Sequence, residues 1–374
     1  MQALSLLIKP ASGMCNLRCT YCFYHDLQRY GAGTFGIMEA VTARRLIDLS
    51  FAACDGTISF CFQGGEPTCA GLDFFRDFSA YASECNEGRC RLEYSIQTNG
   101  TLLDKEWVVY LANGHYLTGL SLDGPSEFHN RFRTDARGKG SHSKALQAWR
   151  LLNQTRVPTN ILAVVTNESA RHPAQLYQYF KKLGAKYLQF IPCLDPLGKP
   201  CGEEPHSLSP KRYGQFLCGL FDLWYTDFQH GEYISIRLFD DWIHNLAGLP
   251  SSSCASQGRC GETLVIEADG SAYPCDFYVT AEQRLGSIWD HTLEELLKRA
   301  KPFREQGQVI PDGCRNCPFL QACRGGCKRN RVVVNDIFER DYHCLAYRQF
   351  FEYAWSILQA LAKGEADCWA RFPH

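Results

Sequence analysis

Short apolar runs alternate with helix-patterned segments along the first half of the chain. The runs are rich in Ile, Leu, Val and Phe and end close to Gly, Pro, Asn or Asp; they span residues 4–10, 57–64, 92–98, 117–124, 159–166 and 187–193. The intervening segments, such as 39–53 and 173–185, place apolar residues at helical spacing. This order predicts six β/α units with a parallel sheet, either curved into a partial barrel or open and doubly wound. Functional groups are then expected at the carboxyl ends of the strands.

The pattern changes near residue 235. Residues 211–231 predict a helix, after which come irregular loops rich in Gly and Cys. The stretch 263–277 reads as a hairpin with Asp269-Gly270 at its turn, and 347–364 predict a last helix. We therefore expect two domains, 1–235 and 236–374.

Composition narrows the class of protein. The 374 residues carry a net charge of −1 and are 45% hydrophobic, with Lys and Arg scattered along the chain. This composition is ordinary for a globular enzyme and gives no electrostatic reason to expect nucleic acid or a membrane as partner. No apolar run approaches the roughly 20 residues of a membrane span. Lys9 and Pro10 end the first apolar run, and no basic leader precedes it, so we expect a cytoplasmic protein.

The 20 cysteines are the most informative part of the composition. A disulfide framework is typical of small secreted proteins, whereas this chain is long and groups its cysteines tightly at two places. Reduced thiolates that bind metal are therefore the favoured interpretation.

The first group is Cys15, Cys19 and Cys22, which form C-x3-C-x2-C directly after the first predicted strand. Thiolates suit iron–sulfur clusters and zinc. Three thiolates on a 4Fe–4S cluster leave one iron without a protein ligand, and that iron can bind a small molecule through an amine and a carboxylate. The alternative is one stripe of a helix, but polar residues interleave without an apolar face.

This spacing, followed by the aromatic Phe23, resembles the radical S-adenosylmethionine superfamily. The resemblance implies a partial (β/α)6 barrel in which the cluster reduces S-adenosylmethionine to a 5′-deoxyadenosyl radical. It also implies a set of cofactor contacts: Gly64, Gly65 and Glu66 of "QGGEP", Ser121, Arg133 and Leu194. The glycine pair could instead be an ordinary turn, and Arg133 a solvated loop arginine.

The second group holds eight cysteines, with "CRNCPFLQACRGGC" as its centre. This C-x2-C-x5-C-x3-C spacing resembles the SPASM extension, which carries two auxiliary 4Fe–4S clusters. The resemblance implies one cluster on Cys254, Cys260, Cys275 and Cys327, and another on Cys314, Cys317, Cys323 and Cys344. The alternative is two zinc knuckles. Nine cysteines remain, and we expect most to pack as small apolar residues: Cys54, Cys61, Cys69, Cys85, Cys90, Cys193, Cys201, Cys218 and Cys368.

Within this class the chain is most similar to anaerobic sulfatase-maturating enzymes, through stretches such as "FQGGEPT", "QFIPCLDPL" and "DGSAYPCDFYV". These enzymes oxidise a Cys or Ser in a sulfatase C/S-x-P-x-R motif to Cα-formylglycine. The oxidation needs a general base beside the radical carbon and an electron acceptor nearby. The resemblance gives Asp276 as the base, directly after the cluster ligand Cys275, and Tyr24 as a substrate contact. The alternatives are a carboxylate bonded to backbone at the hairpin exit and a core tyrosine.

The implied partners are an unfolded or nascent sulfatase peptide and a reductant such as flavodoxin or ferredoxin, with the enzyme a monomer. One alternative is a SPASM enzyme that makes thioethers, carbon–carbon crosslinks or epimers in a ribosomal precursor peptide. Many of those carry an N-terminal recognition domain, for which the early first strand leaves no room. A non-catalytic metal scaffold would leave the open three-cysteine site unexplained. Asp123, His129 and Asp195 are expected to organise loops.

Overall fold

The computed structural model describes residues 1–24, 35–197, 199–334 and 337–371. The chain forms two compact units, each assembled from separate segments. The first unit contains Met1–Leu122, His129–Ile161 and Glu262–Phe303; the second contains Asp123–Phe128, Leu162–Gly261 and the chain from Arg304 onwards. The predicted boundary near residue 235 stays a prediction.

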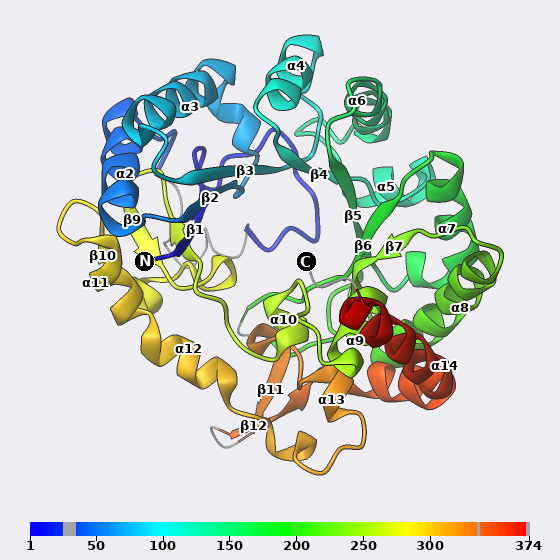
Figure 1. Ribbon diagram of the computed structural model, residues 1–374. Helices are drawn as coiled ribbons and strands as arrows, with labels where there is room; N and C mark the ends of the chain where they lie inside the picture. The colour runs from blue at the N-terminus through cyan, green and yellow to red at the C-terminus, as the bar shows by residue number, and fades with distance from the viewer. Residues whose placement is uncertain (25–34, 198, 335–336, 372–374) are drawn as a thin grey trace. The chain divides into compact units, whose positions relative to one another are not determined.

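A largely parallel sheet forms the centre of the first unit (Figure 1). Strands β1 (Ala3–Ile8), β2 (Thr57–Phe62), β3 (Arg91–Thr98) and β4 (Leu117–Ser121) lie side by side in this order and run parallel. On the other side of β1, β8 (Leu264–Ile266) is parallel, and β9 (Ser271–Tyr273) and β10 (Gly286–Ser287) follow antiparallel. Strand β5 (Thr159–Val165) begins in the first unit and ends in the second.

Helices lie along one face of strands β1–β4 (Figure 1). The helices of the first unit are α2 (Ala40–Ala53), α3 (Leu72–Asn86), α4 (Lys105–Asn113), α6 (His142–Gln154) and α11 (Leu293–Arg299). Phe60 and Phe62 of β2 are buried against α3, with ring centroids 5.1 Å from Phe78 and 4.9 Å from Phe75 respectively. Alternate residues of β1 and β2 are fully buried, as the period of a strand requires.

The second unit is mainly helical. Its helices are α7 (Pro173–Lys182), α8 (Pro210–Gln229), α9 (Arg237–Ala247), α10 (Cys254–Gln257), α13 (Leu320–Cys323) and α14 (Cys344–Arg371). Strands β6 (Tyr187–Pro192) and β7 (Ser235–Ile236) pair in parallel, and β11 (Arg331–Val334) pairs with β12 (Ile337–Asp341) as a hairpin. Phe350 of α14 packs against Phe221 of α8 and Trp242 of α9, at centroid distances of 5.4 and 4.9 Å. Helices α5 (Ser126–Phe132) and α12 (Lys301–Gln308) have residues in both units.

The predicted elements are confirmed. All six predicted strands are present, as β1 to β6, and the four predicted helices are α2, α7, α8 and α14. The hairpin is formed by β8 and β9; Gly270 has φ +86° at its turn, and the backbone N–H of Ser271 donates to Asp269 Oδ1 at 2.8 Å. The small strands β7 and β10 were not predicted, because two residues carry no periodic signal.

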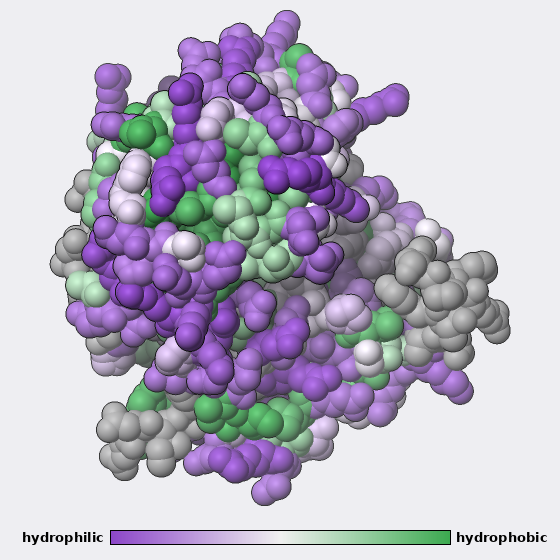
Figure 2. Space-filling view, turned by 60° about the vertical axis from the view of Figure 1, so that its left-hand side comes forward, coloured by the Kyte–Doolittle hydropathy of each residue, from purple (hydrophilic) through white to green (hydrophobic). Residues whose placement is uncertain are grey.

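The polarity of the surface is consistent with helices that bury one side against the sheet or against other helices. Figure 2 shows a mostly hydrophilic face in which apolar side chains form limited patches. Helix α3, for example, buries Phe75, Phe78 and Ala82 on one side. None of the described helices is both long and apolar enough to cross a membrane.

Candidate active site

The three cysteines of the first group lie in the loop that follows β1 in the first unit. Cys19 is buried, while Cys15 and Cys22 are half-buried. The Cys15 sulfur accepts hydrogen bonds from the Leu17 N–H at 3.3 Å and from Asn99 Nδ2 at 3.7 Å. Burial raises the pKa of the Cys15 thiol to about 12, and Cys19 and Cys22 add to the shift through their charges. The three sulfurs are thus close enough to repel one another as thiolates, and a bound iron–sulfur cluster would offset that repulsion.

Main-chain hydrogen bonds fix this cysteine loop against residues 132–135. The Arg18 N–H donates to the Thr134 carbonyl at 2.6 Å, and the Thr20 N–H donates to the Phe132 carbonyl at 3.1 Å. Arg133 is 9% exposed, and its guanidinium lies 5.5 Å from the centre of the Tyr21 ring. The structure therefore brings the predicted cofactor contact Arg133 beside the cysteine loop and contradicts its alternative as a solvated arginine.

The "QGGEP" segment follows β2 and lies against the same loop. The Glu66 N–H donates to the Met14 carbonyl at 2.7 Å. A Cβ at Gly65, which has φ +27°, would overlap that carbonyl oxygen. At Gly64 the space is filled by this chain: a Cβ there would come within 2.5 Å of the Cε of Lys9. The missing side chain at Gly64 thus makes room for Lys9, and the contact of Gly64 with cofactor stays a prediction.

Glu66 ties the ends of β2 and β3 together. Its carboxylate is 1% exposed and accepts four hydrogen bonds, from the Thr98 hydroxyl, the Asn99 N–H, and the N–H and hydroxyl of Thr68, at 2.6 to 3.2 Å. Burial raises the pKa of Glu66, and these donors oppose the rise. The role of Glu66 toward the cofactor stays a prediction, because its oxygens already organise the loop.

The remaining predicted cofactor contacts fall in different units. Ser121 ends β4 in the first unit, and its hydroxyl accepts a hydrogen bond from Gln97 Nε2 at 3.2 Å. Leu194 follows β6 in the second unit and is half-buried. Their contacts with cofactor stay predictions.

Asp276 and Tyr24 form the centre of a buried polar cluster in the first unit. Asp276, 7% exposed, starts a 3-10 turn (Asp276–Tyr278) after the β8–β9 hairpin. Its Oδ2 accepts hydrogen bonds from the Tyr24 hydroxyl at 2.5 Å and from Gln63 Nε2 at 3.1 Å. Its Oδ1 is buried and has no hydrogen-bond partner within the described part of the chain. The donors to Asp276 are side chains, so the alternative of a backbone-bonded carboxylate is wrong.

Tyr24 is held on two sides. Its ring packs in a small apolar core with Val265, Tyr273 and Val279, while its hydroxyl reaches Asp276. Burial and the neighbouring Asp276 charge raise the pKa of Tyr24 well above its ordinary value, so the hydroxyl remains a donor. Tyr24 is therefore a core tyrosine with a polar end at the Asp276 site. Its contact with substrate stays a prediction.

Sequence reasoning missed a buried ion pair beside Asp276. Lys9 Nζ lies 2.5 Å from Glu267 Oε1 and 3.6 Å from Asp276 Oδ1, and the Ser12 hydroxyl donates to Glu267 Oε2 at 2.6 Å. Lys9 and Glu267 are 1% and 0% exposed. The signal was a lone lysine at the end of an apolar strand, which we interpreted only as the end of the apolar run.

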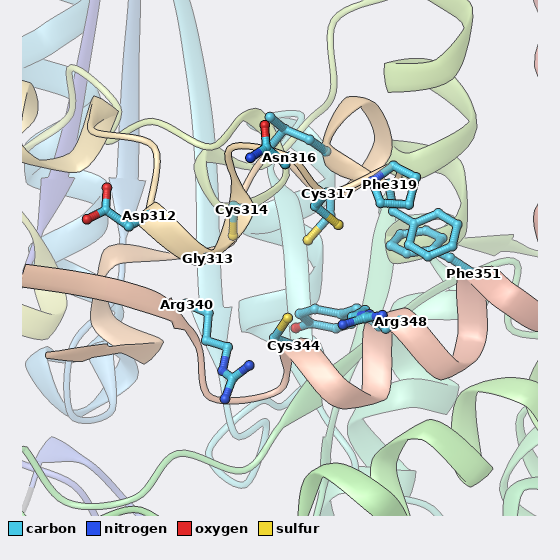
Figure 3. A pocket seen from close by; sticks show the side chains of 15 residues that line it. Asp312, Gly313, Cys314, Asn316, Cys317, Phe319, Arg340, Cys344, Arg348 and Phe351 are labelled. Carbon is cyan, nitrogen blue, oxygen red and sulfur yellow. The ribbon is translucent and has the colours of Figure 1, made fainter. Parts of the chain in front are cut away.

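In the second unit, four cysteines line one cavity of about 310 Å³: Cys314, Cys317, Cys323 and Cys344. The sulfurs of Cys314, Cys317 and Cys344 point into the space between them, with Asp312, Arg340 and Phe351 around it (Figure 3). Burial raises the pKa of the Cys314 thiol to about 11. Among the described residues no group of His, Cys, Asp and Glu is arranged to hold a single metal ion. A shared cavity with four thiols fits a cluster, and this is the set predicted for the second auxiliary cluster.

The other predicted set draws on both units. Cys254, Cys260 and Cys327 belong to the second unit and Cys275 to the first. Burial raises the pKa of Cys327 to about 12, and Cys254 and Cys260 add to this shift. These three sulfurs therefore lie near one another, while the assignment of all four to one cluster stays a prediction.

Loop-organising roles are confirmed for three polar residues. Asp123 accepts a hydrogen bond from the Val164 N–H, His129 is hydrogen-bonded to Ser141, and Asp195 accepts from Gly202 and Ser207.

Of the unassigned cysteines, Cys54, Cys90 and Cys193 are buried and Cys201 is exposed. The Cys90 thiol donates a hydrogen bond to the Cys54 carbonyl at 3.3 Å. The side chain of Cys368 lies outside the described residues.

Comparison with known proteins agrees with this geometry. Residues 10–180 match the radical SAM superfamily, and residues 254–318 match SPASM, an iron–sulfur cluster-binding domain. The fold and the two cysteine groups thus define a radical S-adenosylmethionine enzyme, which uses S-adenosylmethionine and a 4Fe–4S cluster and carries auxiliary clusters in its SPASM segment. The predicted fold class and cofactors are confirmed at this level.

Relatives define the family within this class. The chain is 44% identical over 358 residues to the cysteine-type anaerobic sulfatase-maturating enzyme of Clostridium perfringens, covering 95% of this chain and 97% of the relative. It is 31% identical to the serine-type enzyme of Bacteroides thetaiotaomicron, over 94% of this chain and 89% of that one. The solved structure of anSMEcpe with bound AdoMet and Cp18Cys peptide superposes with a TM-score of 0.92 at 43% identity, covering 97% of this chain and 99% of that chain. The chain belongs to the family of anaerobic sulfatase-maturating enzymes.

Proposed function

We propose that this enzyme oxidises the cysteine of a C-x-P-x-R motif in a sulfatase peptide to Cα-formylglycine under anaerobic conditions. Cysteine is favoured over serine because identity is 44% to a cysteine-type relative and 31% to a serine-type relative. The observation that carries the proposal is the free Oδ1 of Asp276. This buried carboxylate oxygen has no hydrogen-bond partner among the described residues, while Oδ2 is held by Tyr24 and Gln63. A buried acceptor of this kind is available to a substrate thiol.

The reaction removes two electrons from the substrate side chain. Bound S-adenosylmethionine supplies the 5′-deoxyadenosyl radical that takes one hydrogen atom from Cβ. The thiol proton goes to Asp276 Oδ1, and the auxiliary cluster predicted on Cys275 would accept the remaining electron, so that a C=S bond forms. Addition of water and loss of hydrogen sulfide give the aldehyde. Cys275, a predicted ligand of an auxiliary cluster, directly precedes Asp276. One short segment would therefore hold both the base that takes the proton and a ligand of the cluster that takes the electron.

The other roles in this proposal follow the site. Cys15, Cys19 and Cys22 hold the open cluster. The proposed cofactor contacts are the six predicted residues: Gly64, Gly65, Glu66, Ser121, Arg133 and Leu194. Tyr24 contacts the substrate while it orients Asp276. Two auxiliary clusters occupy the sets that contain Cys275 and Cys314.

The cellular setting belongs to the same proposal. A reductant such as flavodoxin or ferredoxin reduces the open cluster, and the substrate is an unfolded or nascent sulfatase. We place the monomeric enzyme in the cytoplasm, where thiolate ligands remain reduced. The domains are 1–235 for the barrel and 236–374 for the SPASM-type extension.

The test is an anaerobic assay on two matched peptides, one with C-x-P-x-R and one with S-x-P-x-R. Mass spectrometry should detect formylglycine on the cysteine peptide, with a higher kcat/KM than on the serine peptide. Abundant 5′-deoxyadenosine without formylglycine on either peptide would reject the substrate assignment. Equal kcat/KM on the two peptides would reject only the preference for cysteine.

A further inference from the structure

Lys9 is a fully buried lysine that contacts both carboxylates of the Asp276 site. Its Nζ is 2.5 Å from Glu267 Oε1, 3.6 Å from Asp276 Oδ1 and 4.9 Å from the centre of the Tyr24 ring. All of these groups belong to the first unit. We infer that Lys9 is a positioning residue of the oxidation step, which holds the free Oδ1 of Asp276 in the orientation that receives the substrate proton.

The carboxylate of Asp276 is held from two sides. Tyr24 and Gln63 donate to Oδ2. On the other side, Lys9 attracts Oδ1 across 3.6 Å, which is an ion-pair distance beyond that of a hydrogen bond. Oδ1 is therefore oriented by charge and still keeps its hydrogen-bonding capacity. An ammonium at hydrogen-bond distance would instead occupy that oxygen.

Lys9 is itself held in place by Glu267. Glu267 takes the short contact with Nζ, and the Ser12 hydroxyl donates to the other oxygen of Glu267 at 2.6 Å. Glu267 thus keeps the ammonium from moving onto Asp276.

The fold makes room for the side chain of Lys9 at Gly64. A Cβ at Gly64 would come within 2.5 Å of Lys9 Cε and 2.7 Å of Lys9 Cγ. The first glycine of "QGGEP" therefore allows the aliphatic part of Lys9 to pass β2 and reach the polar cluster. A lysine whose only function was to neutralise Glu267 would not need to lie beside Asp276 and Tyr24.

The inference rests on the proposed role of Asp276, and the experiment separates the two. Replacing Lys9 alone would leave Glu267 buried and unpaired, which strongly destabilises a protein. The main variant is therefore Lys9→Met/Glu267→Gln, which removes both charges, with Asp276→Asn as comparator. Lys181→Met is the matched control, since Lys181 pairs with Asp227 at 2.7 Å in the second unit.

We expect the double variant to keep its iron content and its KM for the cysteine peptide. Its ratio of 5′-deoxyadenosine to formylglycine should rise about tenfold or more, because a misplaced base loses alignment with the substrate. Lys181→Met should keep the parent ratio. A folded double variant with the parent ratio, beside an Asp276→Asn variant with a raised ratio, overturns the role of Lys9 alone. A parent ratio in Asp276→Asn overturns the proposed base and the role of Lys9 with it.

If the double variant does not fold, the single variant Glu267→Gln tests the positioning role of Lys9. Without its carboxylate partner, Lys9 should move onto Asp276 Oδ1 and occupy it. We therefore expect the same rise in the ratio, with S-adenosylmethionine cleavage retained. A parent ratio in this variant would also overturn the inference.

Discussion

The Tyr24 hydroxyl lies 2.5 Å from Asp276 Oδ2, although 252 positions separate the two residues in the sequence. Tyr24 follows the cysteine loop after β1, and Asp276 follows the hairpin β8–β9, whose first strand pairs with β1. This pairing brings the end of the cysteine loop to the proposed base. The sheet order of the first unit therefore places the proposed base beside the segment that follows the three cysteines of the first group.

Tyr24→Phe tests this hydrogen bond. The change removes a donor to a buried carboxylate, which typically costs about 1.5–3 kcal/mol. We expect a lower melting temperature and slower formylglycine formation, with S-adenosylmethionine cleavage retained. The matched control is Tyr353→Phe, where Tyr353 donates to Asp222 at 2.6 Å but is 54% exposed, so water replaces the lost partner. If both variants behave alike, the Tyr24 contact has no special role.

Asp276→Asn tests the base directly. The amide is nearly isosteric, so folding and the neighbouring Cys275 should tolerate it. Loss of a general base typically slows a reaction by about 10²–10⁴-fold. Radicals should still form and then be quenched, so the ratio of 5′-deoxyadenosine to formylglycine should rise well above that of the parent. Near-parent turnover with an unchanged ratio would remove Asp276 from the mechanism.

Gly65→Ala tests the packing between the cysteine loop and the "QGGEP" segment. The added Cβ would overlap the Met14 carbonyl, one residue before Cys15. The matched control is Gly71→Ala, because Gly71 also has positive φ (+84°) but nothing within 4 Å of the new Cβ. The control should lose about 1–3 kcal/mol of stability through backbone strain alone, because Gly71 has ψ +153°, a conformation that is almost exclusive to glycine. We expect Gly65→Ala to lose more and also to weaken S-adenosylmethionine binding, measured by calorimetry. Equal losses of stability in the two variants would mean that the cysteine loop accommodates the added Cβ at residue 65 by a small shift.

Much of this architecture could be predicted from the sequence. The strands follow from apolar runs bounded by turn residues, and the cysteine spacings identify the class of cofactor. Tyr24 and Asp276 were reached through family resemblance, whereas their mutual contact depends on strand order. Lys9 and Glu267 carry no local motif, because only the parallel pairing of β1 with β8 makes them neighbours. Gly64 was predicted as a cofactor contact, whereas its packing against Lys9 is visible only in three dimensions.

Iron content tests the cluster assignment as a whole. Three 4Fe–4S clusters contain about twelve irons per chain. Replacing Cys15, Cys19 and Cys22 by Ala should remove about four of them and abolish S-adenosylmethionine cleavage, while the auxiliary clusters persist. Cys85→Ala is the control, since Cys85 belongs to neither predicted ligand set. Full cofactor cleavage by the triple variant would refute the open-cluster assignment.

Magnetic spectra of the reduced enzyme test whether the auxiliary clusters are closed. A cluster with four protein thiolates has no iron free to bind S-adenosylmethionine, and Cys314, Cys317, Cys323 and Cys344 line one cavity as such a set requires. Added S-adenosylmethionine should therefore perturb the spectrum of one cluster, and the triple variant that lacks the cysteines of the first group should show no perturbation. A second responsive cluster would mean that one of the eight predicted ligands is wrong. Cys327 and Cys344 would be replaced by Ala first, one at a time. Each is the last cysteine along the sequence in its predicted set of four ligands. The variant that leaves the second response unchanged would identify the residue that never bound iron.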